Sequence, residues 1–97
     1  MKPELREQIL TILAEIPPGR VTSYGRIAAM TDGATPRLVA RALRELPAGH
    51  GLPWFRVITA SRKLADHGGA EEQRRRLVAE GVLFDPHGRV AKDRLWP

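Results

Sequence analysis

Residues 21–46 read VTSYGRIAAMTDGATPRLVARALREL, and this stretch decides the fold. Thr22 or Ser23 can cap a short helix that continues to Met30, because a hydroxyl at this position accepts a hydrogen bond from a free helical N–H group. Asp32-Gly33 then predicts a tight turn. The stretch therefore begins as a short helix followed by a turn.

The next helix is predicted from Pro36 to Leu46, with Thr35 as its N-cap. Its apolar residues follow helical spacing and form one stripe: Leu38, Val39, Ala42, Leu43 and Leu46. Three arginines at i, i+4 and i+7 form an exposed stripe: Arg37, Arg41 and Arg44. A short helix, a turn and an amphipathic helix with an arginine stripe are typical of a helix-turn-helix.

Two further helices are predicted on either side of this motif. Residues 3–16 show one apolar face and end at Pro17-Pro18-Gly19. Residues 70–80 form the other helix, which ends at Gly81. Two ion pairs are expected to support it: Glu71 with Arg75 and Glu72 with Arg76.

Short β segments are predicted in the second half of the chain. Residues 54–58 are apolar and partly β-branched, which favours a buried strand or extended segment. Residues 82–84 and 89–91 flank Asp85-Pro86-His87-Gly88, a plausible sequence for a terminal hairpin. The fold class predicted is mainly α: a winged helix-turn-helix DNA-binding domain with short β segments, in a single domain spanning residues 1–97.

The charge of the chain favours a polyanionic partner. The net charge is +5, and the stretch from Arg20 to Arg44 holds five arginines against one acid, Asp32. Neutralisation of phosphates supplies most non-specific affinity for nucleic acids. A basic surface that is merely solvated is the alternative that charge alone leaves open.

Composition also excludes several classes of function. The chain has no cysteine, which excludes disulfides, thiolate metal sites and a thiol nucleophile. The three histidines, His50, His67 and His87, lie in loops without metal-like spacing, and neither paired carboxylates nor a phosphate-binding glycine loop stands out. We therefore expect no catalytic residue, metal or cofactor. No run of apolar residues is long enough to span a membrane, so a cytoplasmic protein is expected.

Several blocks of the chain resemble a known family. They are residues 16–25 (IPPGRVTSYG), the helix from Pro36, residues 53–58 (PWFRVI), the segment from Gln73 to Val82, and the final Leu95-Trp96-Pro97. The chain resembles the C-terminal domain of the O(6)-alkylguanine-DNA alkyltransferases, whose signature in the third block is Pro-Cys-His-Arg-Val. It looks most like the alkyltransferase-like proteins, in which tryptophan replaces the reactive cysteine.

The resemblance implies a function without catalysis. Such a protein binds double-stranded DNA through the minor groove, flips alkylated guanine into a pocket, and marks it for nucleotide excision repair proteins. Phe55 replaces the histidine that activates the cysteine, and Glu80 matches the acid that orients that histidine. The protein is expected to be a monomer. The alternative is a generic winged-helix regulator without preference for damage.

The resemblance also assigns residues. Tyr24 matches the tyrosine that contacts the phosphate beside the flipped nucleotide, and Ser23 and Gly25 flank it at the DNA. An alignment on residues 39–43 places the arginine that fills the vacated base position at Arg37, whereas an alignment on Ala-Arg-Ala selects Arg41. We prefer Arg37 because it keeps the distance to Pro53-Trp54 without a gap. The alkylguanine pocket is expected to comprise Trp54, Tyr24, Pro53, Val57 and His67.

Overall fold

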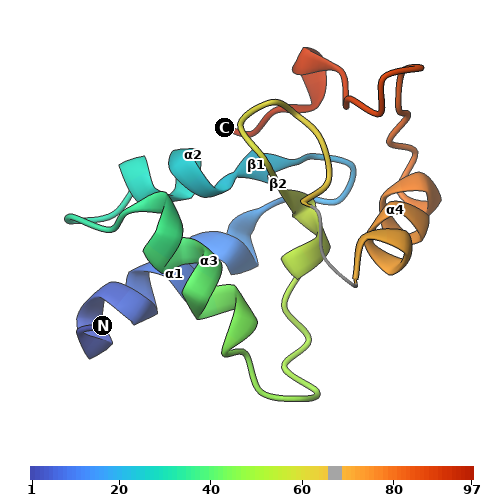
Figure 1. The fold of residues 1–97 in the computed structure, drawn as a ribbon. Coiled ribbons are helices and arrows are strands. Elements are labelled where there is room, and N and C mark those ends of the chain that lie inside the picture. Colours follow the sequence, from blue (N-terminus) through green and yellow to red (C-terminus); the bar gives the residue numbers. More distant parts are fainter. Residues whose placement is uncertain (66–68) are drawn as a thin grey trace.

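The computed structural model describes residues 1–65 and 69–97, and within them the fold is mainly helical (Figure 1). The elements, in chain order, are α1 (Pro3–Glu15), β1 (Thr22–Ser23), α2 (Tyr24–Ala29), α3 (Pro36–Arg44), η1 (Trp54–Arg56), β2 (Val57–Ile58), α4 (Ala70–Ala79) and η2 (Lys92–Arg94). The η elements are single turns of 3-10 helix. The prediction of a mainly α fold with short β segments is confirmed.

The helix-turn-helix is formed by α2 and α3, and side-chain caps begin both helices. Ser23, and not Thr22, caps α2, since its Oγ accepts a hydrogen bond from the Arg26 N–H at 3.1 Å. Thr35 caps α3 as predicted, its Oγ1 accepting from the Leu38 N–H at 3.2 Å. Helix α3 ends at Arg44, two residues before the predicted end at Leu46.

A two-residue parallel sheet connects this motif to the second half of the chain. Thr22 of β1 pairs with Val57 of β2, and Ser23 pairs with Ile58. The prediction of an extended segment from residue 54 was wrong for residues 54–56, which form η1. The Arg56 N–H donates to the Pro53 carbonyl at 3.0 Å, a local turn in place of ladder bonds, because β1 offers only two residues to pair with.

The apolar side chains form two clusters. One lies between the first three helices and includes Ile9, Leu13, Ile16, Ile27, Val39, Ala42 and Val57. The other lies between the sheet, η1, α4 and the C-terminal segment, and comprises Val21, Phe55, Ile58, Leu77, Val82 and Val90. The small sheet contributes to both clusters, so it holds α4 and the helix-turn-helix together.

The C-terminal segment forms a small hairpin. Phe84 and Val90 form an antiparallel bridge, which confirms the predicted hairpin, and Arg89 forms another with Lys63. The predicted ion pair between Glu72 and Arg76 is present at 2.9 Å in α4. Arg75 pairs with Glu72 and not with Glu71, so that part of the prediction was wrong. None of the described helices combines the length and hydropathy needed to cross a bilayer.

Candidate nucleic-acid interface

Tyr24 begins α2, immediately after the Ser23 cap, and its side chain is half-buried. Burial raises the pKa of its hydroxyl, and the positive charge of Arg44 only partly opposes this effect. The hydroxyl therefore stays protonated at physiological pH and can donate a hydrogen bond to an acceptor such as a phosphate oxygen.

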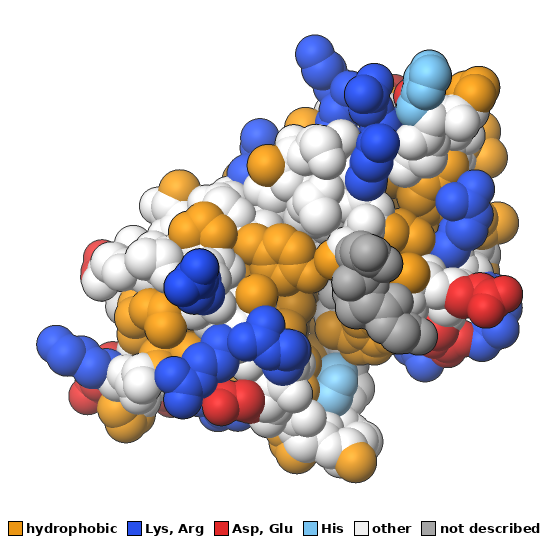
Figure 2. All heavy atoms as spheres, in the orientation of Figure 1, with side chains coloured by type: hydrophobic (Ala, Val, Ile, Leu, Met, Phe, Trp, Pro, Cys, Tyr) orange, Lys and Arg blue, Asp and Glu red, His pale blue; other side chains and the backbone are white. Residues whose placement is uncertain are grey.

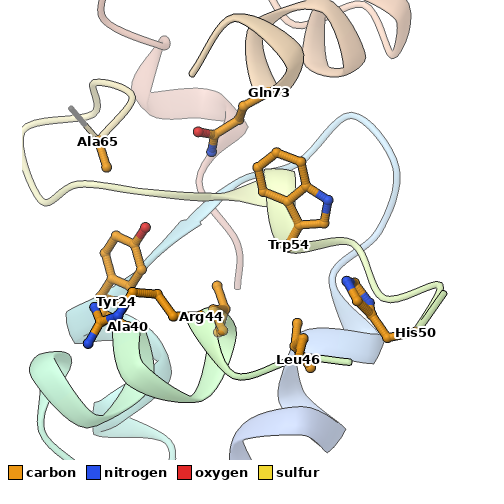
Figure 3. Close-up of a pocket in the computed structure, with 9 residues that line it drawn as sticks. Tyr24, Ala40, Arg44, Leu46, His50, Trp54, Ala65 and Gln73 are labelled. Atoms are coloured by element: carbon orange, nitrogen blue, oxygen red, sulfur yellow. The ribbon is translucent and has the colours of Figure 1, made fainter. Parts of the chain in front are cut away.

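A cavity of about 560 Å³ opens beside this tyrosine (Figure 3). Figure 3 shows Tyr24 and Trp54 on opposite sides of the space. The wall is completed by residues from α3, the following connector, the loop after β2 and α4: Ala40, Leu43, Arg44, Leu46, His50, Ala65 and Gln73. An aromatic and apolar wall with a few polar groups suits a flat organic group such as a nucleobase.

The pocket residues predicted from the sequence are only partly brought together. Tyr24 and Trp54 line the cavity. Pro53 lines a neighbouring cavity of about 490 Å³, which also includes Trp54 and His50. Val57 is 1% exposed and packs in the core, so its side chain does not line the cavity and the prediction does not fit the geometry. His67 lies outside the described residues.

Sequence reasoning missed several residues of this wall. Gln73 is buried in α4, and its Nε2 donates to the carbonyls of Phe55 at 3.1 Å and Val57 at 2.8 Å. His50 accepts a hydrogen bond at Nδ1 from the Leu52 N–H at 2.8 Å, which leaves Nε2 as its proton-bearing atom when the ring is neutral. The available sequence signal for Gln73 was an uncharged residue one helical turn before Leu77 in an otherwise charged helix, whereas the sequence offered none for His50.

The arginine stripe of α3 is exposed as predicted. Arg41 pairs with Glu45, its Nε lying 3.3 Å from Oε2, and about half of each side chain is exposed. Arg37 has no ion-pair partner among the described residues. Arg44 is exposed as well, and its side chain extends past Ala40 toward Tyr24 (Figure 3). The structure thus leaves Arg37 free to reach a ligand, while its assignment over Arg41 stays a prediction.

Gly25 lies in the first turn of α2 and is half-buried. A Cβ atom built there would lie 3.8 Å from Pro36 Cγ and 4.0 Å from Ser23 Oγ, which are ordinary contacts. The fold therefore tolerates a side chain at this position. Close approach of a ligand to the helix backbone would be a reason for glycine here.

Glu80, at the C-terminal end of α4, is held by Arg56 and by a backbone amide. Arg56 Nε donates to Oε1 at 3.1 Å and its Nη2 contacts Oε2, while the Gly19 N–H donates to Oε1 at 3.0 Å. Burial acts to raise the pKa of Glu80, but the hydrogen bonds from Arg56 and Gly19 and the charge of Arg56 outweigh it and leave the pKa below its ordinary value. The carboxylate is therefore ionised and engaged in a structural contact.

Phe55 packs in the second cluster and is 9% exposed. The guanidinium groups of Arg56 and Arg76 lie 5.1 and 5.3 Å from its ring centroid. Its position beside Trp54 is thus filled by a core aromatic, not by a base. Among the described residues, no three His, Asp or Glu side chains gather to hold a metal ion.

Residues 4–82 match the family described as the DNA-binding domain of 6-O-methylguanine DNA methyltransferase. The chain belongs to this family. Within the family, a DNA base-flipping protein of Vibrio parahaemolyticus is 40% identical over 86 residues, which cover 87% of this chain and 86% of that protein. The residue pattern from the Ser23 cap to Pro53-Trp54 therefore belongs to a methyltransferase-type DNA-binding domain.

Solved structures of family members agree with this assignment. Schizosaccharomyces pombe Atl1, in complex with damaged DNA containing O6-carboxymethylguanine, superposes with a TM-score of 0.84 at 26% identity, covering 100% of this chain and 98% of that one. The O6-methylguanine methyltransferase of Mycobacterium tuberculosis, in complex with DNA, has a TM-score of 0.68 at 32% identity. That match covers 82% of this chain but 51% of the methyltransferase, so this chain corresponds to about half of the enzyme.

Proposed function

We propose that this protein binds duplex DNA, flips O6-alkylguanine into the cavity between Tyr24 and Trp54, and holds it without removing the alkyl group. The observation that carries the proposal is this cavity of about 560 Å³, which adjoins both the start of α2 and the arginine-bearing helix α3. The name of the Vibrio relative supports base flipping, and the lesion in the Atl1 complex supports the choice of ligand.

Flipping a base out of the stack costs free energy, and binding of the base in the cavity offsets part of that cost. Unstacking a base costs a few kcal/mol, and less when its pairing is already weakened, as it is by O6-alkylation. The apolar and aromatic wall favours a flat base with an added alkyl group, because binding removes the apolar surfaces of both the alkylated base and the wall from water. Arg37, at the start of α3, is proposed to fill the position that the base vacates.

Alkyl transfer lacks its chemical requirements here. The chain has no cysteine, and Trp54 stands at the matching position. Phe55 offers no base, and Glu80 is already engaged by Arg56 and Gly19. A protein of this kind must pass the lesion on, and we propose nucleotide excision repair proteins as the recipients. We further propose that it acts as a monomer in the cytoplasm.

Titration of two matched duplexes tests the proposal. The duplexes have the same sequence and differ only by a single O6-methylguanine, and both are titrated at one fixed salt concentration. The alkylated duplex should bind roughly tenfold more tightly or better, a difference of about 1.4 kcal/mol. The mass of the protein should not change after incubation. Equal affinities would favour a generic winged-helix regulator, and a gain of one methyl group would identify an enzyme.

Arg37→Ala should weaken binding to alkylated duplex by roughly tenfold or more, on the scale of a lost charged hydrogen bond. Binding to the alkylated single strand should change much less, because a single strand has no base stack with a vacancy to fill. Arg41→Ala, which removes the arginine paired with Glu45, is the matched control. A larger effect at Arg41 would reverse the assignment, and equal losses on duplex and single strand would make Arg37 a phosphate contact.

Trp54→Cys should not restore useful alkyl transfer. An ordinary thiol, with a pKa of about 8.5, is only a few per cent thiolate at pH 7, and Phe55 cannot accept its proton. Adding Phe55→His should raise alkyl transfer above that of the single variant, but only modestly, since Glu80 is held by Arg56 and cannot orient the imidazole without breaking that pair. Protein mass after incubation with methylated duplex is the assay. Rapid stoichiometric methylation of the single variant would contradict this prediction.

A further inference from the structure

A second cavity lies between the start of α2, the turn that follows β2, and η2. Its volume is about 350 Å³, and it is lined by Ser23, Arg26, Thr59, Ala60, Arg62, Lys92 and Leu95. Three of these residues are cations and two carry hydroxyl groups, whereas none is an aspartate or a glutamate. This composition suits an anion with several acceptor oxygens.

The turn that carries Arg62 is held firmly in place. The Arg62 N–H donates to the Thr59 carbonyl at 2.9 Å, and the Val90 N–H donates to the Arg62 carbonyl at 2.8 Å. Thr59 Oγ1 accepts from the Lys63 N–H at 3.2 Å. Arg62 adopts a left-handed backbone conformation with φ 67°, which is unfavourable by roughly 1 kcal/mol for a residue with a Cβ. These bonds maintain that conformation and fix where the arginine side chain leaves the backbone.

Donor groups remain available in the cavity. Arg62 uses Nη1 to bond the Val90 carbonyl at 2.7 Å, and its other guanidinium nitrogens have no partner among the described residues. Arg26 similarly uses Nη2 to bond the Pro97 carbonyl at 3.0 Å. The ammonium of the exposed Lys92 has no hydrogen bond or ion pair within the described part of the chain. Arg26, Arg62 and Lys92 therefore all retain free donors, and Arg62 and Lys92 are the two that lie outside the block from Arg20 to Arg44.

The second cavity adjoins the proposed flipping site through consecutive residues. Ser23 lines the second cavity, and Tyr24, the next residue, lines the first. Figure 2 shows lysine and arginine side chains gathered on one face, both over α3 and near η2 at the top of the view. Figure 1 places α3 below the β1–α2 junction and the turn after β2 above it. A DNA strand whose flipped nucleotide contacts Tyr24 would thus pass basic groups on both sides.

We infer that this second cavity binds a phosphodiester of the DNA backbone, on the side of Tyr24 away from α3. The inference rests on the proposed function, which supplies DNA as the ligand. It extends the electrostatic contact beyond the block from Arg20 to Arg44, because Arg62 and Lys92 come from distant parts of the sequence. Such a contact adds affinity for any duplex and does not distinguish alkylated guanine from guanine.

The double variant Arg62→Ala/Lys92→Ala tests the inference by salt dependence. The block from Arg20 to Arg44 alone predicts a slope of log affinity against log salt of roughly −3 to −4, and the second cavity should make the wild-type slope steeper by roughly 1 to 2. The double variant should lose that increment and bind roughly tenfold or more weakly at ~0.1 M salt. The loss should be equal for alkylated and undamaged duplexes.

A matched control removes two exposed cations that do not line the cavity, Lys2 and Arg75, by substitution with alanine. The slope of log affinity against log salt for this control should differ from the wild-type slope by less than roughly 0.5, which is half of the change expected for one phosphate contact. Loss of the Arg62–Val90 bond could unfold the turn in the double variant. The single variant Lys92→Ala tests the inference without that effect, because Lys92 is exposed and its side chain has no bond to break within the described residues. It should remove about half of the increment lost by the double variant.

Neutral methylphosphonate linkages, placed singly around the lesion, identify the phosphate. Wild-type binding should weaken at one or two fixed positions, and the double variant should be insensitive at those positions. A double variant with the wild-type slope, or an absence of position-specific sensitivity, would overturn the inference even if wild-type protein prefers the alkylated duplex. Loss of that preference in the wild type would instead count against the proposed function, and the slopes would still test the cavity.

Discussion

Tyr24→Ala should lower affinity for a duplex carrying O6-methylguanine by roughly 30-fold or more, the scale for truncating a central aromatic at an interface. The side chain lines the cavity opposite Trp54 and also packs against the first apolar cluster. Its removal therefore takes away a wall of the cavity and a donor beside it. Binding should be measured well below the melting temperature of the variant, because lost packing will also lower stability.

Tyr24→Phe separates the ring from the hydroxyl. It keeps the packing and should reduce affinity by roughly tenfold, the value of one hydrogen bond to a charged acceptor. Since burial raises the pKa of Tyr24, the hydroxyl remains a donor throughout the range from about pH 6 to pH 9, and the difference between Phe and wild type should be constant there. An alanine variant that binds the alkylated duplex as wild type does would remove Tyr24 from the mechanism.

Glu80→Ala should lower the free energy of unfolding by about 3 kcal/mol, because it leaves the largely buried Arg56 guanidinium without its counter-charge. The side chains of Arg56 and Glu80 are 13% and 17% exposed, so water replaces little of the lost contact. The same carboxylate satisfies the Gly19 amide and thereby connects α4 to the loop after α1. Urea denaturation measures the difference.

Two control variants show whether the loss of stability comes from the buried contact of Glu80 with Arg56 or from removal of any acidic residue of α4. Glu72→Ala breaks pairs with Arg75 and Arg76 on the surface of α4 and should cost less than about 1 kcal/mol. Glu80→Gln keeps the shape and an acceptor for Gly19, and it should fall between the two alanine variants. If Glu80→Ala is as mild as Glu72→Ala, the Arg56 contact contributes little to the fold.

The same contact predicts a dependence of stability on pH. The pKa of Glu80 is lower in the folded protein than its ordinary value, so folding favours the ionised form. Its contribution is fully present above the unfolded pKa of about 4.3 and is lost as pH falls through the lower folded value. Acid titration of the unfolding free energy should therefore show a smaller decline for Glu80→Gln than for wild type.

The helices could be predicted because their determinants are local. Hydroxyl caps, proline in the first turn, and apolar residues at helical spacing act within a few positions of one another, and Thr35 begins α3 as the sequence indicates. The helix ends were predicted less accurately: α3 stops at Arg44, and Leu46 follows it in a turn, where its N–H donates to the Leu43 carbonyl at 3.3 Å. The prediction of an extended segment was wrong at residues 54–56, which form η1, for a different reason. The length of β2 depends on how many residues of β1 are available to pair with it.

The binding site was predictable only in part. The family motifs indicated Tyr24 and Trp54, which do line one cavity. They also indicated Val57, whose side chain is buried in the first apolar cluster, because both residues of β2 are enclosed by the core. Ala40, His50 and Gln73 complete the wall from three separate segments, and no local pattern connects those segments.

The sequence by itself determined the helix-turn-helix, the exposed arginine stripe of α3 and the absence of a thiol nucleophile, because each depends on residue type or on spacing within one element. Only the tertiary structure decided which distant groups meet. In the folded chain, Glu80 bonds Arg56 and Gly19, and Arg62 and Lys92 lie with Arg26 around the second cavity. The physical reason is that parallel pairing of β1 with β2 and the packing of two apolar clusters set these long-range positions, and periodicity within one element does not indicate which other element it packs against.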